Sequence, residues 1–93
     1  MNRIHEDIRR RIDQWEGYAR EDVLFLTGMC ASEDEVLGAV ERSWMRTKKE
    51  IETIVVIWHV KKEPAREFAE ELDRRYKAVR ETARRLYEGS LDD

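Results

Sequence analysis

The sequence is poor in the residues that break or cross-link a chain. It has one proline, four glycines and one cysteine in 93 residues. A β-rich domain needs more turn residues than this, so the scarcity of proline and glycine favours long helices. The single thiol, Cys30, excludes an internal disulfide framework and suits a reducing compartment.

Long apolar runs and runs of one charge are also missing. The longest apolar run has five residues, Ile54 to Trp58, whereas a helix needs about 20 to span a bilayer. The stretch MNRIHEDIRRR at the start of the chain has no apolar segment of the kind found in signal peptides. We therefore expect a cytoplasmic protein without a membrane segment. The net charge of −3 is spread evenly along the chain, which argues against a nucleic-acid partner.

Charged residues make up 42% of the chain and hydrophobic residues 41%. The charged share is well above the usual ~25%, and such a composition is typical of long helices and coiled coils. A chain of this length forms one domain, residues 1–93, with a thin core.

Capping residues divide the chain into three segments. Residues 32–35, Ser-Glu-Asp-Glu, have the pattern of a capping box at a helix start. Gly28 suits the left-handed position that follows a helix end, and Pro64 suits the first position of a new helix. We expect helices at about 2–27, 33–62 and 65–88, followed by a tail at 89–93.

Apolar residues recur in each segment in steps of three and four. The three series are Ile8, Ile12, Trp15, Ala19, Asp22 and Leu26; Leu37, Val40, Trp44, Thr47, Ile51, Ile54 and Trp58; and Ala65, Ala69, Leu72, Tyr76, Val79, Ala83 and Leu86. Alternating steps of three and four form a heptad pattern. The pattern predicts an all-α, antiparallel three-helix bundle with coiled-coil-like packing that is able to self-associate.

The stretch IETIVVIWHV, residues 51–60, permits a second interpretation. Strands at 22–27 and 53–60 would flank a helix at 33–50 and give an α/β fold with a two-stranded parallel sheet. Such a sheet is too small to be stable unless a second chain extends it. The heptad phase runs unbroken from Leu37 to Trp58 and favours the helix.

Asp22 is a polar residue at a core position of the first heptad series. A buried carboxylate needs a partner or must be protonated. In an antiparallel bundle, Tyr87 and Arg84 lie near its level. We interpret Asp22 and Tyr87 as a buried polar pair that fixes the register of the helices, or as a candidate catalytic site. The alternative is that Asp22 is exposed in a fraying last turn of the helix.

The two histidines are the candidate metal ligands. His5 begins the first expected helix and His59 ends the second, so antiparallel packing brings them to one end of the bundle. Together with Glu63 they form a candidate metal site. No recognised metal-binding spacing is present, so two solvent-exposed histidines are the alternative, and we expect no cofactor.

The segment IRRRID, residues 8–13, resembles part of the first helix of the AroQ chorismate mutases, which are small all-helical enzymes. In that family an arginine at the position of Arg9 helps to bind the substrate carboxylates. The resemblance covers six residues, and the middle-helix pattern and late glutamine of the family have no counterpart here. It implies a small helical enzyme as an alternative function, in which Arg9 or Arg11 would act with Asp22 and Tyr87.

The first two helices carry more apolar residues than their core stripes need. At about 100° per residue, Val56 and Val60 fall on the far side of the second helix, and Ile57 falls off its stripe. The residues outside the stripes are Leu24, Phe25, Met45, Val56, Ile57 and Val60. Excess apolar surface predicts self-association or a protein partner, so we expect a non-catalytic interaction or scaffold protein.

Several surface features are common in designed helical proteins. They are the heavy use of glutamate and arginine, pairs of opposite charge with the acid first, and the capping box. Gly17, Gly38, Met29 and Cys30 are irregular and argue against a fully idealised design. The pattern indicates either a designed protein or a natural scaffold with an altered surface.

Overall fold

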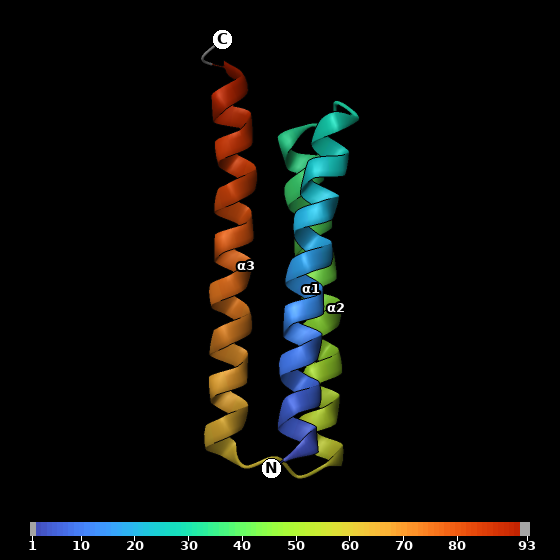
Figure 1. Ribbon diagram of the computed structural model, residues 1–93, viewed down its shortest axis with the longest axis vertical. Coiled ribbons are helices and arrows are strands. Elements are labelled where there is room, and N and C mark those ends of the chain that lie inside the picture. Colours follow the sequence, from blue (N-terminus) through green and yellow to red (C-terminus); the bar gives the residue numbers. More distant parts are fainter. Residues whose placement is uncertain (1, 92–93) are drawn as a thin grey trace.

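The chain forms three antiparallel helices and no strand within the described range. The computed structural model describes the backbone of residues 2–91 and the side chains of residues 2–88. The helices are α1 (Arg3–Gly28), α2 (Glu33–Ile57) and α3 (Lys62–Leu91). They lie side by side in a rod with extents of 51 × 19 × 18 Å (Figure 1). The all-α prediction is confirmed, and the alternative two-stranded sheet is wrong.

Side-chain and backbone caps set the helix starts. The Asn2 side chain accepts hydrogen bonds from the amides of Ile4 and His5, and Ser32 Oγ accepts one from the amide of Glu35 at 3.2 Å. These contacts satisfy amide groups that have no partner inside the helix. The capping role predicted for Ser32 is confirmed.

Pro64 is the third residue of α3, in its first turn, rather than at its first position. The helix begins at Lys62, and the amide of Ala65 donates to the carbonyl of Lys61 at 3.0 Å. Proline is tolerated there because amides of the first turn have no intrahelical partner. α3 also continues through residues 89–91, where we expected a tail, and the last two residues of that tail lie outside the described residues.

α1 ends in a Schellman motif, a turn in which two amides donate back to the last helical turn. The amide of Cys30 donates to the carbonyl of Thr27 at 3.1 Å, and that of Ala31 donates to Leu26 at 3.0 Å. The left-handed residue is Cys30, with φ 63°, and not Gly28 as predicted. Gly28 is the last helical residue. The motif normally uses glycine at this position, because a Cβ atom is strained there.

α2 ends by the same motif at Ile57, instead of continuing to residue 62. The amides of His59 and Val60 donate to the carbonyls of Val56 and Val55 at 3.4 and 3.0 Å. His59 has the left-handed conformation, with φ 51°. The turn brings Val60 back against the core, so the prediction that Val60 lies outside the core is wrong.

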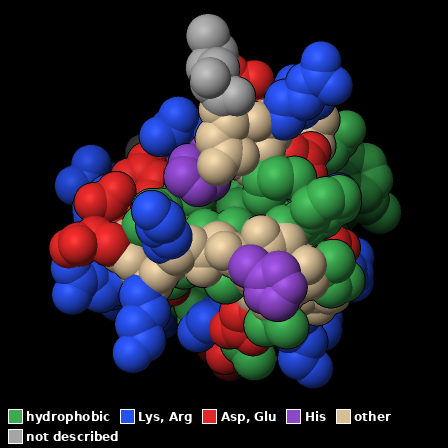
Figure 2. All heavy atoms as spheres, turned by 90° about the horizontal axis from the view of Figure 1, so that it is seen from below, with side chains coloured by type: hydrophobic (Ala, Val, Ile, Leu, Met, Phe, Trp, Pro, Cys, Tyr) green, Lys and Arg blue, Asp and Glu red, His purple; other side chains and the backbone are tan. Residues whose placement is uncertain are grey.

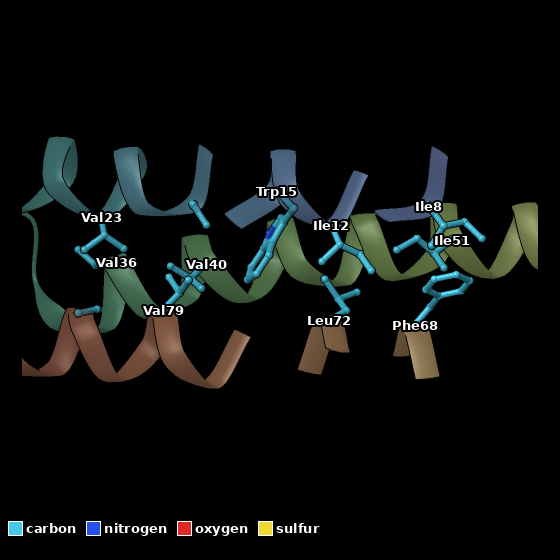
Figure 3. Packing of buried hydrophobic residues seen from close by; sticks show 12 residues of the cluster. Ile8, Ile12, Trp15, Val23, Val36, Val40, Ile51, Phe68, Leu72 and Val79 are labelled. Carbon is cyan, nitrogen blue, oxygen red and sulfur yellow. The ribbon is translucent and has the colours of Figure 1, made fainter. Parts of the chain in front are cut away.

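The core is one apolar seam that runs along the length of the bundle. Figure 3 shows Ile8, Ile51 and Phe68 meeting near one end and Val23 and Val36 near the other. Its buried members are Ile8, Ile12, Trp15, Ala19, Val23, Val36, Val40, Ile51, Phe68, Leu72, Val79 and Ala83. All three helices contribute, so each helix depends on the other two for burial.

An aromatic layer near the middle of the seam connects the three helices. The Trp15 side chain of α1 donates from Nε1 to Ser43 Oγ of α2 at 2.9 Å. Trp44 of α2 stacks on Tyr76 of α3, with ring centroids 4.2 Å apart and planes 10° apart. The buried Nε1 of Trp44 has no hydrogen-bond partner in the described part of the chain, so Trp44 contributes through packing.

The heptad prediction is wrong at Asp22. Asp22 is exposed, and its neighbour Val23 is buried instead. The buried series on α1 steps from Trp15 to Ala19 to Val23, two steps of four residues. A straight α-helix has about 3.6 residues per turn, so a strict heptad drifts off the buried face and an extra step of four corrects the drift.

Other positions also differ from the heptad series, and Val36 is fully buried where the series has its neighbour Leu37. Phe68 is buried, whereas Ala69 is exposed. Burial of an aromatic ring gains more than burial of a methyl group, so the larger of these two residues takes the core position. Trp58 is 62% exposed because it follows the last residue of α2 and leaves the helical stripe.

The conformations of Gly28 and Cys30 at the end of α1 can be tested by substitution. Gly28 has no positive φ, and a Cβ atom there would meet nothing within 4 Å. Gly28→Ala should therefore stabilise the fold by about 0.5 kcal/mol, and Cys30→Gly should stabilise it by about 1 kcal/mol. Urea unfolding measures both. A loss of stability in Gly28→Ala would place the left-handed turn at Gly28 instead.

Candidate interaction surface

Large apolar side chains remain exposed on this bundle. They are Tyr18, Leu24, Phe25, Met29, Met45, Val56, Ile57 and Trp58. Five of the six residues predicted to lie outside the core are among them, and Val60 is the exception. Tyr18, Met29 and Trp58 were not predicted, although Tyr18 and Met29 also lie outside the heptad series.

These residues do not form one continuous patch. Tyr18 and Phe25 are separated by seven residues, so they share one face of α1, whereas Leu24 lies about 100° away from Phe25 around the helix. Met29 follows the last residue of α1. A second group is at the C-terminal end of α2, with Ile57 62% exposed. Figure 2 looks at this end of the bundle and shows hydrophobic side chains between charged ones.

A third group follows the solvent side of α2. Met45, Lys49, Glu52 and Val56 are spaced by four, three and four residues and therefore share one face. We call these four residues the α2 stripe. All four are exposed, with Val56 71% exposed and Met45 44% exposed. Neither Lys49 nor Glu52 forms an ion pair with another described residue.

An apolar groove lies beside the α2 stripe, between α2 and α3, with a volume of about 200 Å³. We call it the α2–α3 groove. Its lining residues are Lys48, Ile51, Glu52, Val55, Val56, Ala65, Ala69 and Leu72. Ala65 and Ala69 leave the groove open because their side chains are single methyl groups. The Nζ atom of Lys48 lies over the Trp44 ring, 5.0 Å from its centroid. The sequence analysis did not identify this groove.

The groove between α1 and α3 has a different character, because ion pairs cross it. Arg75 of α3 pairs with Asp13 of α1, lies 3.7 Å from Glu16 and bonds Glu71 at 2.9 Å. Arg74 also bonds Glu71. Arg74 and Arg75 are therefore matched within the protein, whereas Arg9, which also lines this groove, lies over the Phe68 ring.

The electrostatics of these pairs follow from their hydrogen bonds. Hydrogen bonds from Arg74 and then Arg75 lower the pKa of Glu71 below its ordinary value. Burial lowers the pKa of Arg75, but hydrogen bonds to Asp13 and Glu71 outweigh burial, and its pKa is raised. The charged forms are stabilised, as expected for ion pairs. The pairs of Arg75 with Asp13 and Glu16 cross from α3 to α1, whereas those of Glu71 lie within α3.

Of the residues proposed for an enzymatic site, Arg11 and Asp22 line the same groove between α1 and α2, where Arg11 pairs with Glu50. Arg9 and Tyr87 lie elsewhere. Arg9 rests over the Phe68 ring, with its guanidinium carbon 5.7 Å from the centroid. Asp22 is exposed. The Tyr87 hydroxyl donates a hydrogen bond to the carbonyl of Ala31, which lies in the connection between α1 and α2. The expected buried pair of Asp22 and Tyr87 is not formed.

The three residues proposed for a metal site, His5, His59 and Glu63, have different surroundings. The His5 ring meets the edge of Phe68, with centroids 5.3 Å apart, and Glu63 pairs with Arg66 at 3.0 Å. His59 is exposed. Figure 2 shows both histidines on the same end of the bundle. Among the residues whose side chains are described, no group of three or more His, Cys, Asp or Glu is placed to hold a metal ion.

Within the described residues, no helix has an apolar stretch long enough to span a membrane.

The fold and surface define a small three-helix bundle with exposed apolar side chains on a charged exterior. Compared with protein-family models, curated proteins and solved structures, the chain gives no match. The function must therefore be argued from the surface itself.

The ion pairs of Glu71 predict a pH dependence. The pKa of Glu71 is lower in the folded chain than in the unfolded chain, so Glu71 stabilises the fold above its ordinary pKa and loses this effect as the pH falls through its folded pKa. Urea unfolding at about pH 7 and about pH 3 measures this loss. We expect it to be smaller in Glu71→Gln than in the wild type, by about 0.5 kcal/mol.

The matched control for this experiment is Glu70→Gln. The nearest arginine nitrogen to Glu70 is that of Arg66, at 3.9 Å. This variant should keep the wild-type pH dependence, and an identical dependence in all three proteins would contradict a stabilising role for the Glu71 pairs.

Proposed function

We propose that this chain is a non-catalytic interaction protein that binds itself or a protein partner through its exposed apolar side chains. The observation that carries the proposal is the exposure of large apolar groups: Phe25 is 65% exposed, in addition to Val56 and Trp58. Full burial of one such side chain gains about 1.5–3 kcal/mol. A partner that covers several of them would gain enough to bind.

The core supports the proposal because it is complete without these residues. The buried seam contains side chains of all three helices and none of the exposed group. Exposed apolar residues that do not serve the fold are typical of protein interaction sites. The charged residues around them would form a polar rim, which contributes to the choice of partner more than to affinity.

The polar groups support a binding role over a catalytic one. Arg75, Arg74 and Glu71 are matched by one another and by Asp13, and the Tyr87 hydroxyl is used in a turn contact. These groups act as structural contacts. We also propose a reducing compartment such as the cytoplasm, which the single, exposed thiol of Cys30 favours.

Polar substitution of the exposed apolar residues tests the proposal. The triple variant Phe25→Ser, Ile57→Ser and Trp58→Ser should keep its helical circular dichroism and change unfolding free energy by less than about 1 kcal/mol, because surface residues contribute little to stability. It should bind less of an apolar fluorescent dye such as ANS than the wild type does, because three exposed apolar side chains are removed.

The matched control replaces three exposed charged residues, Arg10, Glu21 and Lys61, by serine. This variant should keep the dye binding and association of the wild type. A wild-type protein that binds no dye and stays monomeric at millimolar concentration would contradict the proposed function.

A further inference from the structure

We propose that a second copy of this chain docks on the α2 stripe, in an antiparallel dimer with two-fold symmetry. The inference rests on the proposed function and names the partner. It comes from the spacing of the four residues along α2. The midpoint between Lys49 and Glu52 is also the midpoint between Met45 and Val56.

A two-fold axis at this common midpoint pairs unlike residues across the interface. In an antiparallel pair of α2 helices, Met45 of one copy lies opposite the partner's Val56, and Lys49 lies opposite the partner's Glu52. Two-fold symmetry repeats each contact, so that every residue finds its counterpart twice. Apolar groups meet apolar groups, and charges meet opposite charges.

The charges of the α2 stripe are available for this pairing. Lys49 and Glu52 are exposed, and neither has an ion-pair partner among the described residues of its own copy. A stripe with charges of one sign would repel a second copy of itself. This stripe is self-complementary only when the two helices run antiparallel, so the charges specify the orientation of the dimer.

The apolar contact between Val56 and the partner's Met45 would be buried in the α2–α3 groove. Val56 lines this groove together with Ala65 and Ala69. The antiparallel pairing brings the partner's Met45 next to Val56, at the opening of the groove. Small side chains permit close approach, and the flexible side chain of methionine adapts to an irregular space. The dimer would fill two equivalent grooves, one in each copy.

The size of the contact predicts a weak dimer. Each copy contributes two exposed apolar residues and two charges from one helical face, which is less than the interfaces of stable dimers usually contain. We therefore expect association that depends on concentration between micromolar and millimolar protein.

Charge reversal with complementation tests the inference. In Lys49→Glu both charges of the α2 stripe are acidic, and in Glu52→Lys both are basic. Each variant alone should self-associate about tenfold more weakly than the wild type, because two-fold symmetry replaces two attractive pairs by two repulsive ones. An equimolar mixture of the two should form a heterodimer, because every charge then faces an opposite charge.

Sedimentation equilibrium of the separate and mixed proteins measures these effects, and the double variant Lys49→Glu, Glu52→Lys should regain wild-type association. Lys61→Glu and Glu21→Lys, at exposed positions off the α2 stripe, control for net charge and should leave association unchanged. Circular dichroism checks that each protein is folded, which we expect because Lys49 and Glu52 form no ion pair with the described residues of their own copy.

The possible results separate this inference from the proposed function. Association of the mixture without association of either variant supports the antiparallel dimer. A wild type that binds ANS but stays monomeric overturns the dimer and leaves a different protein as the partner. Association that persists in Lys49→Glu and Glu52→Lys, yet disappears in the triple serine variant, overturns the role of the α2 stripe and retains the proposed function.

Discussion

No helix of this chain is stable alone, because each one carries a single apolar stripe on a strongly charged surface. The whole structure depends on the alignment of these stripes into one seam (Figure 3). The seam sets α3 beside α1, and only then can Arg75 reach Asp13 across the groove. It also leaves the α2 stripe facing solvent, where Met45 and Val56 are available for contact.

The number, order and direction of the helices could be predicted from the sequence, because periodic apolar residues and the Ser32 cap are local signals. Choices between neighbouring residues could not. The heptad template selected Asp22 and Ala69, whereas the structure buries Val23 and Phe68. Each choice differs by one residue along the helix. It is decided by the straightness of the helix and by the space that the other two helices leave, neither of which is visible in a single segment.

The candidate interaction surface also has features that could be predicted from the sequence and features that could not. The exposure of Phe25 and Ile57 follows from helical geometry and was predictable. The burial of Val60 was not, because α2 ends at Ile57 and a left-handed residue, His59, turns the chain back toward the core. The α2–α3 groove depends on how closely two helices approach, which depends on packing along their whole length. The exposure of residues far from the apolar stripe of a helix can therefore be read from its sequence, but the space left between two packed helices cannot.

The short turns between the helices have a consequence for how the chain folds. Helices that are neighbours in sequence are also neighbours in space, and only four residues, 29–32 and 58–61, connect each pair. Such local connections give a low contact order, which is typical of proteins that fold in microseconds to milliseconds. The contacts between α1 and α3 are the exception, because Arg75 and Asp13 are separated by 62 positions. Closing that long loop has the largest entropic cost, so we expect a helical hairpin to form first and the ionic groove to close last.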